Sequence, residues 1–251
     1  MTTEQKQIIS NYFQNEMYGI WRQGETVSYE LLGKDPKDTP DYKPANPFEV
    51  IGGELVKIKI EKDGKQASFI VHAFLPDSSS QESKQYPHGN PFIICMHPIM
   101  PKDLALQNGY ALFFMDSYQI ASDDINHKGA FYDLYPYTTD KQNQTGVSRW
   151  GKATAVCGAF DNRFAMPIPA CTGEDWVNAP AMWECYKKAN SYFCEQKLSD
   201  HLVVNFHKEG HAVLAEDMEL IISYFNKMYF GFETSININH LKTSVFENQN
   251  Q

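Results

Sequence analysis

Apolar residues near the N-terminus recur at the spacing of an α-helix. Between residues 4 and 21 the apolar positions are Ile8, Ile9, Tyr12, Phe13, Met17, Ile20 and Trp21. This pattern predicts an amphipathic helix that lies on the domain. Residues 22–50 are rich in proline, glycine and aspartate, which predicts a loop.

The pattern then changes to the two-residue period of a β-strand. Residues 56–60 alternate apolar and polar side chains, residues 63–64 are Asp-Gly, and residues 67–75 are again mostly apolar. Asp-Gly suits a tight turn between two antiparallel strands. We therefore expect a β-hairpin in this part of the chain.

Two continuous apolar runs follow, at residues 92–96 and 110–115. Runs of this kind are typical of strands buried on both faces. Residues 102–108 between them can form one or two helical turns. A strand, a short crossover and a second strand indicate a parallel pair and an α/β sheet.

The second half of the chain has weaker patterns. Residues 116–145 are polar and aromatic with little periodicity, which predicts a functional loop or the absence of an element. Short apolar segments predict strands at 164–171 and 201–206. Helices are expected from about residue 173 and over residues 218–229.

The expected domain organisation is simple. Residues 1–231 are predicted to form one domain, which suits the length of the chain. Residues 232–251 are polar and rich in asparagine, which predicts a tail without stable structure.

Composition excludes several classes of function. The net charge of −9 argues against binding nucleic acid or an anionic membrane surface. No apolar run approaches the length of a membrane span, and the first residues lack the pattern of a signal peptide. Five cysteines without a CxxC pair are typical of reduced thiols. We therefore expect a cytoplasmic protein without a membrane partner.

Residues 146–153 contain the strongest candidate for chemistry. Ser148 lies between Gly146 and a run of small residues at the start of a helical pattern, which is typical of a nucleophile elbow. The match to G-x-S-x-G is imperfect, because Gly151 comes one position late. Ser148 could equally be the N-cap of the following helix.

A serine nucleophile needs a base and an acid that orients the base. His211 is favoured as the base over His207, because it lies on a loop after a predicted strand and before a helix. Glu174 and Asp175 are candidates for the acid, although both could simply be first-turn acids stabilised by the helix dipole. Two further aspartates are weaker candidates, Asp161 and Asp200.

Donors for a developing oxyanion are also expected near the serine. The backbone amide of Arg149 and a backbone group near His97 could serve. The charges of Arg149 and Lys152 would suit a carboxylate or a sugar-acid ester, or could be ordinary solvated charges. Trp150 and Trp176 could stack on a sugar ring or belong to the core. Motifs for nucleotides and metals are missing from the sequence, so no cofactor and no metal are expected.

Three segments together resemble glucuronoyl esterases, which are related to acetyl xylan esterase-like hydrolases. They are Gly146–Ala153, Cys157–Arg163 and Ile168–Ala170. The resemblance implies an α/β-hydrolase-like fold: a mostly parallel sheet flanked by helices, here with an N-terminal β-hairpin. It also implies that Arg149 helps to stabilise the oxyanion and that Lys152 contacts the sugar.

The chain departs from that family in two places. A strand and a helix are missing before Gly146, and residues 169–173 directly adjoin residues 174–176, where relatives carry a long sugar-binding region. The fold is therefore expected to be incomplete, as if two internal segments were removed. We expect a serine ester hydrolase acting on a glucuronoyl or acetyl ester of xylan, with a small-molecule or oligosaccharide ester as its substrate. The alternative is an inactive shortened relative or a carbohydrate-binding protein.

Overall fold

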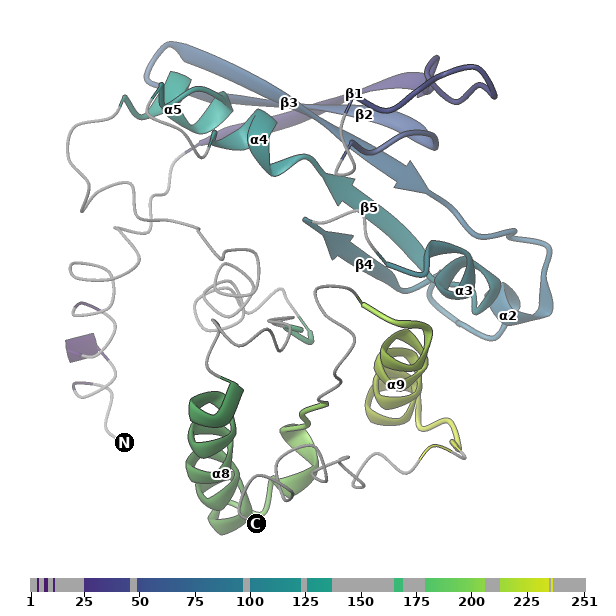
Figure 1. Ribbon diagram of the computed structural model, residues 1–251, viewed down its shortest axis with the longest axis vertical. Helices are drawn as coiled ribbons and strands as arrows, with labels where there is room; N and C mark the ends of the chain where they lie inside the picture. Colours follow the sequence, from purple (N-terminus) through teal and green to yellow (C-terminus); the bar gives the residue numbers. More distant parts are fainter. Residues whose placement is uncertain are drawn as a thin grey trace. The chain divides into compact units, whose positions relative to one another are not determined.

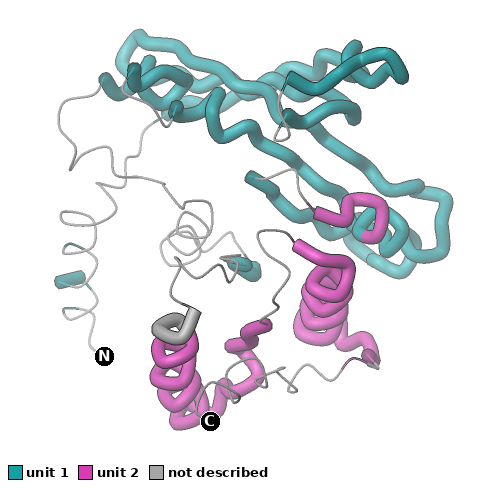
Figure 2. The backbone as a smooth tube through the Cα atoms, in the orientation of Figure 1, with its two compact units in different colours: residues 1–98, 105–169 teal, residues 99–104, 170–251 magenta. Residues whose placement is uncertain are grey.

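The computed structural model describes residues 4, 7, 8, 11, 25–45, 49–96, 100–122, 126–136, 165–168, 179–205, 213–234 and 236. The chain divides into two compact units (Figure 2). Unit 1 comprises residues 1–98 and 105–169, and unit 2 comprises residues 99–104 and 170–251. The single domain over residues 1–231 and the tail over residues 232–251 stay predictions.

Unit 1 contains a five-stranded sheet with the order β1-β2-β3-β5-β4 (Figure 1). The strands are β1 (Thr26–Lys34), β2 (Glu54–Lys62), β3 (Lys65–Phe74), β4 (Phe92–Cys95) and β5 (Ala111–Met115). The pair β4–β5 is parallel, and the other three pairs are antiparallel. The α/β class with flanking helices is confirmed. Within the described residues, however, the sheet is mixed rather than mostly parallel, because β1–β3 extend it on the antiparallel side.

The predicted β-hairpin is confirmed as β2 and β3. Their backbones pair from Glu54–Ala73 to Lys62–Lys65. The two turn residues, Asp63 and Gly64, have φ angles of 50° and 76°. Both lie in the left-handed region that a two-residue hairpin turn of type I′ requires, and Asp-Gly adopts it readily.

Strand β1 lies in the stretch predicted to be a loop, so that part of the prediction is wrong. Val27, Tyr29 and Leu31 alternate with more polar residues, which is a strand pattern. The glycines, prolines and aspartates of the flanking residues outweighed this short alternation. β1 pairs with β2 alone and its residues are mostly exposed, so few of its side chains are held by burial.

Strands β4 and β5 are confirmed as a parallel pair, with α3 (Lys102–Gln107) between them in sequence. β5 is buried, and Leu112 and Phe114 are 0% and 2% exposed. β4 was predicted to be buried on both faces, but Phe92 and Ile94 are 60% and 40% exposed. β4 is the edge strand of the described sheet, so it has only β5 beside it to cover its side chains.

Helices α4 (Ser117–Ile120) and α5 (Ala130–Leu134) lie in the predicted long loop. Both contact β3. Ala130 and Leu134 of α5 form a buried cluster with Ala67 of β3. A further short helix, α2 (Gln81–Lys84), is capped by Ser80, whose hydroxyl accepts a hydrogen bond from the Ser83 amide.

Unit 2 is helical in its described residues. Its elements are α8 (Ala179–Glu195), η3 (Ser199–His201), α9 (Ala215–Phe225) and the π-turn η4 (Asn226–Phe230). The last helix is therefore confirmed, with Met218 and Ile222 buried. None of the helices among the described residues is long and apolar enough to span a membrane.

Two predicted strands are not strands where the structure describes them. Residues 165–168 and 202–205 adopt no regular structure. Pro167 has no N–H to donate to a ladder, which disfavours the first segment. The second segment is apolar enough, but a strand also needs a neighbour, and no described strand pairs with it.

Replacing Leu112 with alanine tests the position of the core. The side chain is fully buried, so the substitution should lower the free energy of unfolding by about 2–5 kcal/mol through lost burial and a cavity. Leu75→Ala is the matched control, because Leu75 is exposed and should change stability by less than about 0.5 kcal/mol. Urea denaturation followed by circular dichroism measures both. Equal losses in the two variants would contradict this core.

Candidate active site

The predicted site residues all lie outside the described residues. They are Ser148, His211, Glu174, Asp175, Arg149, Lys152, His97, Trp150 and Trp176. The alternatives His207 and Asp161 lie outside them too. The roles given to these residues therefore stay predictions, and the described part of the chain shows the scaffold that leads to some of them.

Asp200 is the one alternative acid that the structure describes. It lies in η3, and its carboxylate is 3.8 Å from Nε2 of the neighbouring His201. Both side chains are exposed, and such surface pairs contribute little. The Asp200 carbonyl accepts a hydrogen bond from the Tyr224 hydroxyl at 2.6 Å. This geometry explains Asp200 as a surface residue and gives no support to a role as the catalytic acid.

The carboxyl ends of β4 and β5 mark one edge of the sheet. Cys95, the last residue of β4, pairs with Phe114, and β5 ends one residue later at Met115. Ligands of open α/β sheets bind beyond the carboxyl ends of parallel strands. His97 follows β4 by two residues in the sequence, so the segment predicted to supply an oxyanion donor starts from this edge.

A buried row of side chains lies next to this edge. His72, Phe114 and Cys95 are directly opposite one another on β3, β5 and β4. All three are buried, and the ring of Phe114 meets the ring of Phe74 edge-on at 5.6 Å. Burial raises the pKa of the Cys95 thiol to about 12. Because the thiolate is the nucleophilic form, this thiol is inert at neutral pH and serves the packing of the edge.

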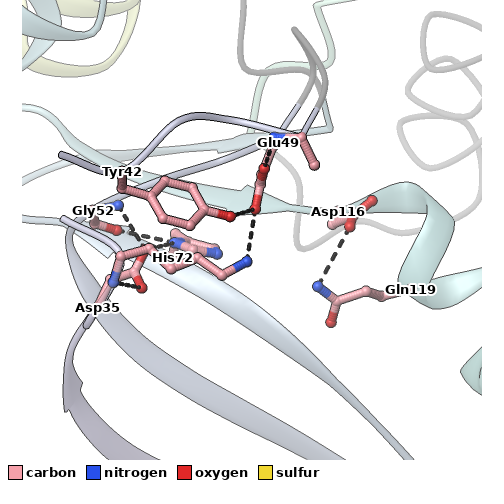
Figure 3. A network of polar contacts seen from close by, with 9 residues as sticks. Asp35, Tyr42, Glu49, Gly52, His72, Asp116 and Gln119 are labelled. Carbon is pink, nitrogen blue, oxygen red and sulfur yellow. Dashed lines mark hydrogen bonds and ion pairs between the residues drawn. The ribbon is translucent and has the colours of Figure 1, made fainter. Parts of the chain in front are cut away.

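Polar contacts around Asp35 hold the end of β1 to the start of β2 and to β3 (Figure 3). Oδ2 of Asp35 accepts the Gly52 amide at 2.8 Å, and Oδ1 accepts the Lys37 amide at 2.9 Å. The Gly53 carbonyl accepts the Asp35 amide at 3.0 Å. Nδ1 of His72 lies 3.0 Å from the Gly52 carbonyl. We call Asp35, Gly52 and His72 the Asp35 network.

The Asp35 network is structural although it contains a buried histidine and a buried aspartate. A carbonyl oxygen can only accept, so Nδ1 of His72 carries the proton and donates it to Gly52. Oδ2 of Asp35 is 3.7 Å from Nδ1, too far for a good hydrogen bond. The carboxylate is instead occupied by two backbone amides. Neither side chain is arranged to activate a nucleophile.

The loop between β1 and β2 carries a second network, centred on Glu49 (Figure 3). Its carboxylate accepts hydrogen bonds from Nζ of Lys37 at 2.7 Å, the Tyr42 hydroxyl at 2.8 Å and the Ala45 amide at 2.6 Å. Lys37 first, then the Ala45 amide and Tyr42, lower the pKa of Glu49 to about 2. The carboxylate is therefore ionised at neutral pH and ties this loop to itself.

Asp116 follows β5 directly at the carboxyl edge. Its carboxylate accepts the Tyr118 amide at 2.9 Å and so caps α4, while Nε2 of Gln119 lies 3.4 Å away (Figure 3). Oε1 of Gln119 accepts the Ile70 amide at 3.0 Å, which ties α4 to β3. Asp116 is thus used by a helix cap. Among the described residues, no group of three potential metal ligands comes together.

One curated protein is similar to nearly the whole chain. No protein-family model matches, but a multidomain esterase of Ruminococcus flavefaciens is 26% identical over 366 residues, which covers 95% of the chain. The match covers 45% of that esterase, so the chain spans less than half of its length. The aligned stretch is longer than the 251 residues of the chain. The esterase therefore has residues inside it that the chain lacks.

Two solved structures share the fold. A carbohydrate esterase family 15 (CE15) glucuronoyl esterase from Caldicellulosiruptor kristjansonii has a TM-score of 0.72 at 18% identity, covering 94% of the chain and 88% of that structure. The glucuronoyl esterase catalytic domain from Hypocrea jecorina has a TM-score of 0.61 at 15% identity, covering 93% and 86%. The predicted resemblance is confirmed: the chain has the α/β fold of glucuronoyl esterases.

Asp35→Ala tests the support that lies behind the carboxyl edge. It leaves the amides of Gly52 and Lys37 without their acceptor, so the free energy of unfolding should fall by about 1–3 kcal/mol. Asp41→Ala is the matched control, because Asp41 is exposed in the same loop; its effect should stay within about 0.5 kcal/mol. Urea denaturation measures both. An unchanged stability of Asp35→Ala would show that the Asp35 network does not hold the loop.

Proposed function

We propose that the chain is a serine ester hydrolase that acts on a carbohydrate ester. The observation that carries the proposal is the segment Gly146–Lys152, which has the Gly-x-Ser-Arg-x-Gly-Lys pattern, in a chain with the fold of glucuronoyl esterases. Fold alone does not determine function, and the motif supplies the chemical groups. The similarity to a multidomain esterase over 95% of the chain supports the same reaction class.

The proposed mechanism is acyl transfer to Ser148. His211 takes the hydroxyl proton while Ser148 attacks the ester carbonyl, and Glu174 or Asp175 orients the histidine and stabilises its charge. The Arg149 backbone amide and side chain stabilise the oxyanion, with a backbone group near His97. The tetrahedral intermediate collapses, and His211 returns the proton to the leaving alcohol. Water, activated by the same histidine, then releases the acid and restores Ser148.

The substrate class follows from the charges beside the serine. Arg149 and Lys152 add two positive charges next to Ser148 in a chain with a net charge of −9. Such cations suit a sugar acid, whose carboxylate is formed as the ester is cleaved. Trp150 and Trp176 offer flat faces to a sugar ring. We therefore propose a glucuronoyl ester as the first choice and an acetyl ester of xylan as the second.

A second candidate is a non-catalytic relative that binds carbohydrate without turnover. Two observations favour it: Phe92 and Ile94 are exposed on the edge strand β4, and the related esterase is longer within the aligned stretch. Apolar side chains on an edge strand are typical of a strand that has lost a neighbour. In this case the sugar-facing residues would remain useful while the triad would not assemble.

Ser148→Ala tests the proposed nucleophile. The variant should lose at least about 10³-fold in kcat/KM, because the residual rate of triad variants comes only from binding and oxyanion stabilisation. Release of benzyl alcohol from a benzyl ester of glucuronic acid measures the rate. Thr154→Ala, close by in the sequence, is the control and should keep its activity. Equal turnover by Ser148→Ala would refute the mechanism. Wild-type protein that binds glucuronic acid without turnover would favour the second candidate.

Lys152→Met tests the substrate class. Loss of a charge that contacts the sugar acid should raise KM for the benzyl glucuronate ester about 10-fold and leave kcat nearly unchanged, which is the signature of lost ground-state binding. Hydrolysis of p-nitrophenyl acetate should not change. Lys141→Met removes the same charge outside the motif and is the control. A parallel loss on both esters would argue against a sugar-binding role for Lys152.

A further inference from the structure

One face of the β1–β2–β3 sheet is apolar across all three strands. Residues directly opposite one another in antiparallel strands point to the same face. The register gives three apolar rows: Val27–Ile60–Ala67, Tyr29–Ile58–Phe69 and Leu31–Val56–Val71. We call these rows the apolar face.

Burial decreases across the apolar face from β3 to β1. At β3, Ala67 and Val71 are buried, and α5 packs on Ala67. At β2 the three side chains are half-buried. At β1, Val27, Tyr29 and Leu31 are 63%, 71% and 72% exposed. The side of the sheet that carries α5 is therefore covered only in part.

The opposite face of the same strands is polar and needs no cover. It carries Ser28, Glu30, Lys57, Lys59 and Ser68, as the alternation requires. Nζ of Lys59 lies 2.6 Å from the carboxylate of Glu30, and both side chains are about half exposed. This sheet thus has one solvent face and one face that calls for a second layer, as in other helix-on-sheet arrangements.

The N-terminal segment has the matching chemistry. Its residues 4, 7, 8 and 11, which the structure describes, are helical. Nε2 of Gln7 donates to Oδ1 of Asn11 at 2.9 Å, which marks a polar side of the helix. Ile8, on the apolar stripe, is 61% exposed. Two uncovered apolar surfaces therefore occur in unit 1, one on the segment and one on the sheet.

Lengths and connection also match. A helix over residues 4–21 would be about 27 Å long, and β1, with nine residues, is about 30 Å long. Four residues, 22–25, join the helix to β1 and include Gly24. Connections of this length are usual between a helix and a strand that run antiparallel to each other.

We infer that residues 4–21 form a helix whose apolar stripe packs on the β1–β2 part of the apolar face, beside α5. This packing removes Val27, Tyr29 and Leu31 from water. It also covers an edge of the sheet that would otherwise offer an apolar surface to other chains. The inference concerns the assembly of unit 1 and is independent of the proposed esterase reaction.

Hydrogen exchange of the full chain tests the inference, with Tyr29→Glu as the variant and Ser28→Glu as its matched control on the polar face. Backbone amides of residues 8–21 should be protected in the wild type. They should exchange at least about 10-fold faster in Tyr29→Glu, because a charge on the apolar face opposes docking. Ser28→Glu should leave them unchanged. Amides of β3 and β5 report whether the sheet itself stays folded.

Three results would overturn the inference. One is an equal exchange rate of residues 8–21 in the wild type and in Tyr29→Glu. Another is protection that appears only as the protein concentration rises, together with a dimer mass in sedimentation, because the occupant would then be a second copy. If Tyr29→Glu also exposes β3, Tyr12→Glu repeats the test from the helix side. Unchanged exchange of β1 amides in that variant is the third contradicting result.

Discussion

The pairing of β3 with β5 joins the two kinds of sheet in unit 1. Four residue pairs, from Val71–Met115 to Phe74–Leu112, connect the antiparallel strands to the parallel pair. His72 lies within this pairing and is held through Gly52 to the start of β2. Because a backbone polar group that loses its partner away from water is costly, these contacts keep the carboxyl edge of β4 and β5 in register with the rest of the sheet.

Patterns that are long or carry a distinctive turn could be predicted from the sequence. The hairpin depended on Asp63-Gly64, and the parallel pair on two apolar runs of five and six residues. β1 could not be predicted in the same way, because its alternation is short and its strand is stabilised by pairing with β2 rather than by burial. The exposed faces of Phe92 and Ile94 could not be foreseen either, since an apolar run does not show how many neighbours its strand has.

The candidate site was predicted from residue types and spacing, without geometry. The Gly146–Lys152 motif gives a nucleophile, a cation for the oxyanion and a cation for the sugar, and the shared fold makes this combination meaningful. The Asp35 network had no sequence signal, because its members are far apart in the chain and two of its hydrogen bonds use backbone groups. A buried His–Asp neighbourhood alone would have suggested chemistry. Its hydrogen bonds show that it supports the fold.

The most direct test of the proposed function is covalent labelling of the active serine. A fluorophosphonate reacts with a serine only when a base activates it and an oxyanion site receives the phosphoryl oxygen. Intact-mass and peptide mass spectrometry of the labelled full chain identify the modified residue. The account predicts one label, on Ser148, which is lost in His211→Ala. No labelling of folded protein, or a label at another residue, would contradict it.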